Sequence, residues 1–196
     1  MKQRREGRDI PIGTVALFRK RRGLRYWVME LRPAEPADAM EVARLHVRTW
    51  QEAYRGIIPD EYLGRLRAED RAARYDFAAG GARKLFTMLA VESGKVAGFA
   101  TTGPSGQADL PEHGELYALY VGPEWWGSGI GAALMLSARG RLRKLGFRSA
   151  ALWVFAANER ARRFYEIDGW AVDGVQKTDP RFGADLEEVR YQRVLD

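Results

Sequence analysis

The chain has 196 residues, of which 46% are hydrophobic and 30% charged, values typical of one globular domain with its own hydrophobic core. It contains no cysteine, which excludes disulfides, thiolate metal sites and a cysteine nucleophile, and its two histidines are too few for a His-rich metal site. The longest apolar run, residues 150–157, is far too short to span a membrane, so we expect no membrane partner.

Positive charge is concentrated at the N-terminus. Residues 1–25 hold nine Lys or Arg against Glu6 and Asp9, a net charge of +7, whereas the whole chain carries +6. The high isoelectric point therefore belongs to this arm. Such an arm could contact nucleic acid or an acidic surface, but its composition favours a solvated, disordered leader. Pro11 and Gly13 interrupt its short apolar stretch and argue against a secretory signal, so we expect a cytoplasmic protein.

Met29 begins a segment that would make a natural start of the protein. We therefore interpret residues 1–28 as a basic extension, either disordered or a start-site artefact, and residues 29–196 as one domain. Alternating apolar residues predict strands, and apolar residues three or four apart predict helices. Predicted strands comprise residues 26–32, 85–92, 96–102, 115–121, 149–155, 170–175 and 186–195, and predicted helices begin at Pro36, Pro59, Ala68, Ile130 and Asn158.

Several boundaries rest on turn residues. Gly56 should end the first helix, and the third should run over residues 68–79. Ser93-Gly94-Lys95 predicts a hairpin, and residues 103–114 and 178–183 should form a loop and a turn. This order of elements predicts a mixed sheet with helices on its faces, an α/β or α+β fold.

The stretch Glu115–Leu145 is the centre of this arrangement. It predicts a strand, a loop containing Gly127, Gly129 and Gly131, and a helix beginning at Ile130. Glycine lets the backbone approach a ligand closely, and a helix N-terminus offers unpaired N–H groups to an anion. The stretch therefore predicts a phosphate or pyrophosphate site.

Two other glycine-loop motifs fit less well. The P-loop motif, which requires Gly-Lys-Ser/Thr, is absent. Gly127-x-Gly129-x-x-Ala132 matches a relaxed dinucleotide-binding pattern, but five residues separate it from the strand that ends at Val121. The next strand also ends in Phe155-Ala156, without the acidic residue that would bind a ribose.

The sequence resembles the GNAT N-acyltransferase superfamily in two stretches, LYALYVGPEWWGSGIGAALM and LWVFAANERARRFYEIDGW. With the similar N-terminal part RPAEPADAMEVARLHVRTWQEAYRGIIPDEYL, the resemblance covers about residues 29–195. It implies a mostly antiparallel central sheet of about seven strands with helices on both faces, in which the fourth and fifth strands splay apart. The family's loop Gln/Arg-x-x-Gly-x-Gly/Ala reads Trp126-Gly127-Ser128-Gly129-Ile130-Gly131, so Trp126 departs from the pattern.

The resemblance implies acetyl-CoA as co-substrate and no metal. Pantetheine would lie between strands 115–121 and 149–155, paired with strand backbone, while loop amides would hold the pyrophosphate. Because Trp126 removes a polar side chain near the phosphates, we expect altered cofactor affinity. The implied cofactor-binding residues are Leu119, Tyr120, Val121, Trp126, Gly127, Ser128, Gly129, Ile130, Gly131, Ala132 and Asn158.

The implied catalytic residues are Tyr165, which would protonate the departing thiolate, and Glu115, which would take a proton from the acceptor amine directly or through water. From the residues alone, Tyr165 also fits a core aromatic, Asn158 a helix N-cap and Glu115 an exposed carboxylate. His113 is a second candidate base. His46, within the first helix, is interpreted as a packed side chain.

These features predict an acetyl-CoA-dependent N-acetyltransferase acting by direct attack on a primary amine, carried by a small molecule, peptide or protein. Two alternatives are a non-catalytic acyl-CoA-binding regulatory module and a nucleic-acid-binding protein that uses the basic arm. The family resemblance also allows a homodimer. The expected walls of the acceptor pocket are Trp50, Tyr54, Ile58, Tyr62 and residues near 178–183.

Overall fold

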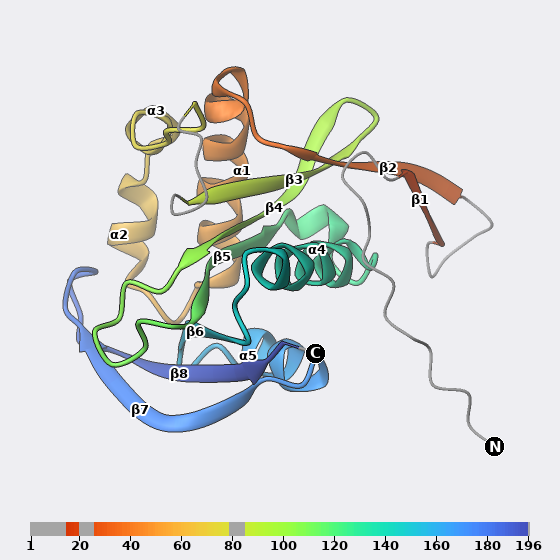
Figure 1. Cartoon of the computed structure of the whole chain (residues 1–196). Helices are drawn as coiled ribbons and strands as arrows, with labels where there is room; N and C mark the ends of the chain where they lie inside the picture. The colour runs from red at the N-terminus through yellow and green to blue at the C-terminus, as the bar shows by residue number, and fades with distance from the viewer. Residues whose placement is uncertain (1–14, 20–25, 79–84, 196) are drawn as a thin grey trace.

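The protein is described by a computed structural model, which covers residues 15–19, 26–78 and 85–195 (Figure 1). Eight strands form one sheet in the order β1–β2–β3–β4–β5–β6–β8–β7. The strands are β1 (Val15–Arg19), β2 (Tyr26–Pro33), β3 (Phe86–Glu92), β4 (Lys95–Pro104), β5 (Gly114–Val121), β6 (Ser149–Phe155), β7 (Ala171–Asp179) and β8 (Leu186–Val194). The helices are η1 (Pro36–Asp38), α1 (Ala39–Ala53), α2 (Asp60–Arg65), α3 (Ala68–Ala72), η2 (Pro123–Trp125), α4 (Ile130–Lys144) and α5 (Glu159–Ile167).

The predicted fold class is confirmed. All neighbouring strands are antiparallel except β5 and β6, and all seven predicted strands are present. The eighth strand, β1, was not predicted; it pairs with β2 and falls within the segment 1–28. Residues 1–14 and 20–25, which carry most of the basic arm, lie outside the described residues, so the division at residue 28 stays a prediction.

Helices cover both faces of the sheet, and β4 shows how (Figure 1). Phe99 points to one face and packs with Val42 and Leu45 of α1. Its neighbour Gly98 lies on the other face against α4, where an added Cβ would come within 2.8 Å of the Tyr120 carbonyl oxygen and 3.1 Å of Leu134 Cδ1. A side chain at this position would therefore push α4 away from the sheet.

The third helix is shorter than predicted. The sequence predicted a helix over residues 68–79, but α3 ends at Ala72. The chain leaves the helix because Tyr75 and Phe77 stack on each other, with ring centroids 4.9 Å apart, and pack against the cluster around Phe99. Burial of these two rings outweighs the helical propensity of the charged residues before them.

The last hairpin also differs from the prediction. Strand β7 extends to Asp179, beyond the predicted Val175, through a register shift between Val172 and Gln176. Gly174 has φ of 89° within this irregular stretch, a conformation that glycine adopts without strain. The turn into β8 therefore begins after Asp179, two residues later than predicted.

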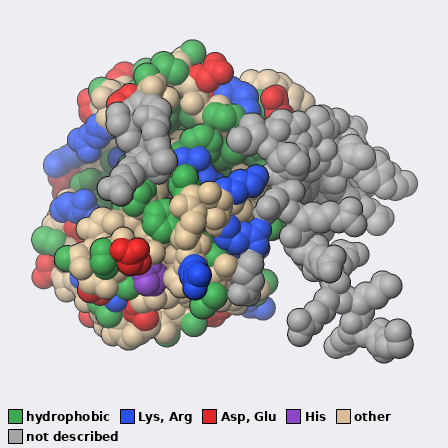
Figure 2. Space-filling view, in the orientation of Figure 1, with side chains coloured by type: hydrophobic (Ala, Val, Ile, Leu, Met, Phe, Trp, Pro, Cys, Tyr) green, Lys and Arg blue, Asp and Glu red, His purple; other side chains and the backbone are tan. Residues whose placement is uncertain are grey.

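The surface carries charges of both signs. On the face shown in Figure 2, blue and red side chains are interspersed over the described part of the molecule. Within that part, no helix combines the length and apolar character needed to cross a bilayer.

Candidate active site

A cavity opens where β5 and β6 part. The two strands pair only at Gly114 with Ala150 and at Glu115 with Ala151. Immediately afterwards Tyr117 is bulged, because Thr102 pairs with Leu116 whereas Thr101 pairs with Ala118. A bulge bends its strand, and here the bend coincides with the point where β5 leaves β6. The splayed strands predicted from the family resemblance are therefore present.

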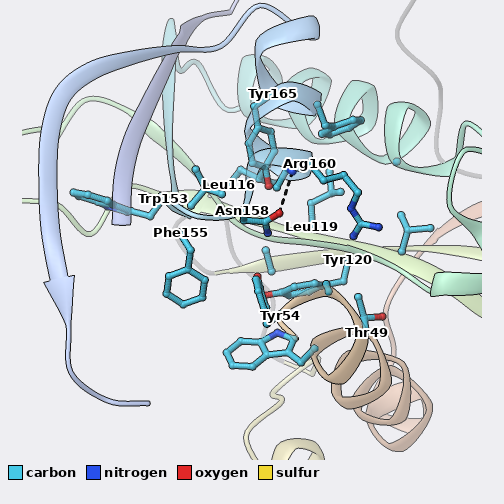
Figure 3. Close-up of a pocket in the computed structure, with 18 of the residues that line it drawn as sticks. Thr49, Tyr54, Leu116, Leu119, Tyr120, Trp153, Phe155, Asn158, Arg160 and Tyr165 are labelled. Atoms are coloured by element: carbon cyan, nitrogen blue, oxygen red, sulfur yellow. Dashed lines mark hydrogen bonds between the residues drawn. The ribbon is translucent and has the colours of Figure 1, made fainter. Parts of the chain in front are cut away.

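The cavity between the two strands has a volume of about 570 Å³ (Figure 3). Its lining comes from α1, β5, the glycine loop, β6, α5 and the β7–β8 turn. Of the predicted site residues, Glu115, Leu119, Tyr120, Val121, Trp126, Gly127, Gly129, Gly131, Ala132, Asn158 and Tyr165 line it. The other three, His113, Ser128 and Ile130, do not.

The glycine loop reaches the cavity through its backbone. Gly127 and Gly129 have φ of 73° and 96°, in the left-handed region, and Gly129 directly precedes α4. The side chain of Ile130 is fully buried in the core, so this residue can offer a ligand only its backbone. Ser128 stays within the loop, where its hydroxyl accepts weakly from the Ile130 N–H at 3.4 Å.

Trp126 interacts with two neighbours at the edge of the cavity. Its Nε1 donates to the Val121 carbonyl oxygen at 2.7 Å, so one backbone acceptor of β5 is already paired. Arg160, in the first turn of α5, stacks on the indole with its Cζ 3.4 Å from the ring centroid. Burial lowers the pKa of Arg160 from its usual value, yet the group remains a cation at neutral pH.

Arg160 was missed by the sequence analysis. Among the described residues, no carboxylate forms an ion pair with it. The sequence did contain a signal for it: Trp126 replaces the polar residue of the family's loop, and the cationic Arg160 stands two positions after Asn158. Only the structure shows that the two side chains meet at the cavity.

Asn158, which precedes α5, and Tyr165, within α5, lie on the same side of the cavity as Arg160 (Figure 3). The side chain of Asn158 accepts from the Ala161 N–H at 3.1 Å, so its predicted role as N-cap is confirmed. Tyr165 is 8% exposed, and burial, followed by the nearby Tyr120, raises its pKa well above the usual value. Its hydroxyl has no hydrogen-bond partner in the described part of the chain. It is therefore a protonated, uncommitted donor at neutral pH.

Glu115 is not the exposed carboxylate that one interpretation expected, because it is only 7% exposed. Its Oε2 accepts from Ser105 Oγ at 3.0 Å and from Gln107 Nε2 at 3.2 Å. The Gln107 amide is oriented by Arg190, whose Nη1 donates to Gln107 Oε1 at 2.8 Å. His113, the second candidate base, is half-buried and does not line the cavity, and its buried Nδ1 has no partner among the described residues.

Of the residues predicted to form the wall of the acceptor pocket, some line the cavity and others pack behind it. Trp50 and Tyr54 line the cavity, together with Phe182 from the β7–β8 turn. Ile58 is buried in the core behind them, and Tyr62 packs edge-on against Phe182 with ring centroids 5.2 Å apart. The latter two residues therefore support the wall from behind.

Residues 42–170 match the Acetyltransferase (GNAT) family. This chain belongs to the GNAT acetyltransferase family. The match spans α1 to α5 and so includes every element that lines the cavity except the β7–β8 hairpin. The family predicted from the two sequence stretches is confirmed.

Curated relatives agree with this assignment of the GNAT chain. An uncharacterized N-acetyltransferase of Bacillus subtilis is 32% identical over 133 residues, which cover 67% of this chain and 74% of the relative. A probable N-acetyltransferase of Mycobacterium tuberculosis is 27% identical over 166 residues, 84% of this chain and 92% of the relative.

Solved structures share the fold. PaiA N-acetyltransferase of Thermoplasma acidophilum, in complex with coenzyme A, superposes with a TM-score of 0.64 at 21% identity, covering 85% of this chain and 98% of that one. A putative acetyltransferase of Salmonella typhimurium, with its cofactor acetyl-CoA, gives 0.65 at 22% identity, covering 86% and 94%. In the described part of this GNAT chain, no group of three or more His, Asp or Glu side chains could hold a metal ion.

His46 belongs to the core behind the cavity, as interpreted from the sequence. It is buried, its Nδ1 lies 2.8 Å from the Tyr75 hydroxyl and its Nε2 lies 3.0 Å from Arg71 Nη2. Burial, followed by the positive charge of Arg71, lowers the pKa of His46 to about 3. The imidazole is therefore neutral, accepts from Arg71 and links α1 to the chain after α3.

His46 should make stability depend on acidity. Its folded-state pKa of about 3 lies below the unfolded value near 6.5, so its contribution is complete above pH 6.5 and is lost as pH falls toward 3. In that window the free energy of unfolding should fall by up to about 1.4 kcal/mol per pH unit from this group. Urea unfolding at several pH values checks this, and His46→Gln should flatten the profile.

Proposed function

We propose that this protein transfers the acetyl group of acetyl-CoA to a primary amine, by direct attack of the amine within a ternary complex. The observation that carries the proposal is the opening between β5 and β6. Three features lie around this space: the part of β5 that does not pair with β6, a glycine-rich loop at the N-terminus of α4, and a protonated tyrosine. These are the parts needed to hold an acyl-pantetheine, its pyrophosphate and its departing sulfur.

The geometry supports a specific set of proposed cofactor contacts. Pantetheine lies along β5 and pairs with the backbone of residues 119–121 as an added strand would. The amides of residues 127–132, together with the positive end of the α4 dipole, bind the pyrophosphate. Asn158 uses its side-chain oxygen as the N-cap, which leaves its amide nitrogen to donate to the cofactor.

Proton transfers are assigned to two residues. A free alkylamine has a pKa near 10.4, so about 99.9% of it is protonated at neutral pH, and Glu115 takes one proton directly or through water. The neutral amine forms the C–N bond while a β5 N–H stabilises the developing oxyanion. As the C–S bond breaks, Tyr165 gives its proton to sulfur. The second proton of the nitrogen returns to Tyr165 through solvent, so each turnover releases one proton.

Two measurements test this function. Isothermal titration should show binding of acetyl-CoA, and a thiol reagent should detect free coenzyme A when acetyl-CoA and a primary amine are both present. Binding without thiol release across a broad set of amines would contradict the enzyme and support a non-catalytic acyl-CoA-binding module. Absence of binding would contradict the assignment of the cavity.

Arg160 should supply a positive charge for the cofactor phosphates in place of the polar loop residue that Trp126 replaces. Its stacking on Trp126 fixes the guanidinium at the edge of the cavity without using its N–H donors. Arg160→Ala should weaken binding of acetyl-CoA by roughly tenfold to a hundredfold, the size expected for charge-assisted hydrogen bonds. Titration calorimetry measures the change in Kd.

A matched control separates this effect from damage to α5. Arg163→Ala removes an exposed arginine of the same helix that does not line the cavity, and should leave Kd unchanged. S-acetylpantetheine, which lacks the phosphates, should bind wild type and Arg160→Ala equally. An equal loss for both ligands would show that Arg160 does not act on phosphate.

A further inference from the structure

The cavity has a second end, beyond the proposed cofactor cleft, and four aromatic rings form its wall. Trp50 comes from α1, Tyr54 from its C-terminal cap, Phe155 from the end of β6 and Phe182 from the β7–β8 turn. The rings contact one another in a closed circuit, with centroids 5.1 Å apart for Trp50–Tyr54, 5.3 Å for Tyr54–Phe155, 5.6 Å for Phe155–Phe182 and 5.7 Å for Phe182–Trp50. Figure 3 shows Tyr54 and Phe155 on the side of the cavity opposite Tyr165. A ligand at this end therefore meets mostly apolar surface and ring edges.

Two carboxylates also line the cavity. Glu115 has one oxygen engaged by Ser105 and Gln107, which leaves Oε1 without a hydrogen-bond partner among the described residues. Glu188 of β8 lies opposite Phe155 of β6 in the strand ladder. Its Oε2 is 3.1 Å from Lys177 Nζ. The Glu188 charge also contributes to raising the pKa of Tyr54 and of Tyr120, after burial, so it acts on the cavity.

The basic residues that line the cavity already interact with other groups. Within the described residues, Arg160 and Arg181 are the basic side chains that line it. Arg160 stacks on Trp126, at the edge of the proposed phosphate site. Arg181 is 74% exposed at the side chain, and its guanidinium is engaged by Asp179. Two further cations lie near the aromatic end: Lys177 pairs with Glu188, and Arg71, whose Cζ lies 5.5 Å from the centroid of the Trp50 ring, is hydrogen-bonded to His46. Each cation near this end therefore already has a partner, whereas Glu115 Oε1 has none among the described residues.

We propose that the acceptor is a primary amine on an aromatic or bulky apolar body, with no carboxylate beside the amine. This inference rests on the proposed acetyltransferase function and adds the class of acceptor. The ammonium group is attracted by Glu115 and Glu188, and the body packs against the four rings. A carboxylate on the carbon that bears the amine would be desolvated near Glu188 without a free cation to pair with it.

Three amines of similar size test the inference: 2-phenylethylamine, phenylalanine, which adds only a carboxylate, and glucosamine, whose body is polar. The value of kcat/KM for thiol release should be at least roughly tenfold higher for 2-phenylethylamine than for the other two. An equal or higher value for phenylalanine or glucosamine would overturn the acceptor class and leave the acetyltransferase function standing. If neither these three amines nor any other amine supported thiol release, the acetyltransferase function itself would be contradicted.

Variants of the wall provide a second test. Phe182→Ala should raise KM for 2-phenylethylamine by roughly tenfold, and Glu188→Gln should reduce the preference over phenylalanine by a similar factor. Both should keep the wild-type Kd for acetyl-CoA, which shows that the fold is intact. Glu187→Gln is the matched control, because Glu187 is exposed, adjoins Glu188 on β8 and does not line the cavity. An unchanged preference in Glu188→Gln would overturn the role of that carboxylate.

Discussion

Tyr165→Phe should lower kcat by roughly a hundredfold to a thousandfold, within the range usual for loss of a positioned general acid. The hydroxyl of Tyr165 has no hydrogen-bond partner in the described part of the chain, and burial keeps it protonated by raising its pKa. Removing the oxygen therefore costs no internal hydrogen bond and leaves the ring in place. The expected result is a loss of turnover with an almost unchanged Kd for acetyl-CoA. Steady-state kinetics and titration calorimetry measure the two quantities separately.

Tyr191→Phe is a suitable control for this experiment. Tyr191 is fully buried, its ring centroid lies 6.3 Å from that of Tyr165, and its hydroxyl bonds to Arg162 and Glu166. It does not line the cavity, so its replacement should lower stability and leave kcat close to the wild-type value. Wild-type turnover in Tyr165→Phe would remove Tyr165 as the acid.

Glu115→Gln should lower kcat/KM at neutral pH by roughly a hundredfold to ten-thousandfold. Glutamine keeps the hydrogen-bonding size of the side chain but cannot take a proton from the ammonium group. Without the base, the reaction depends on amine that is already neutral, about 0.04% of a lysine-type amine at pH 7. The rate of the variant should therefore rise steeply with pH toward the pKa of the amine, whereas the wild-type rate should level off earlier. A pH profile of kcat/KM shows the difference.

The basicity of the acceptor gives an independent check. An amine with a pKa near 8 is roughly 9% neutral at pH 7, so its reaction should be much less sensitive to the loss of Glu115. Glu112→Gln changes an exposed carboxylate of the loop before β5 that does not line the cavity, and should have no effect. Equal losses for weakly and strongly basic amines would indicate a structural role for Glu115.

The sequence predicted the framework of the fold because that framework rests on local patterns. In β2, Met29 and Leu31 are buried on either side of exposed Glu30, as their alternation required. The glycines at 127 and 129 adopt the left-handed conformations that make their loop possible. The seven-residue spacing of Asn158 and Tyr165 placed both on one face of α5, toward the cavity.

Features that depend on contacts between distant segments were not predictable in this way. The helix after Ala68 ends early because Tyr75 and Phe77 are drawn into a core cluster with Phe99. The amide of Gln107 is fixed by Arg190, which is 83 residues away in the chain. Arg160 meets Trp126 only because α5 is packed beside the glycine loop. The last two contacts lie at the site, and the sequence alone did not show that the residues of any of the three meet.

The short stretch of pairing between β5 and β6 has a thermodynamic consequence. Strands β1 to β5 form one half of the sheet and β6 to β8 the other, and the ladder between them contains only two residue pairs. A ligand that pairs with β5 in the gap continues the interrupted ladder, so in the proposed complex it acts as part of the sheet. Its binding energy then adds directly to the free energy of unfolding, by about 2.7 kcal/mol at a ligand concentration of a hundred times Kd. The cellular pool of acetyl-CoA would thus set how firmly the two half-sheets are held together.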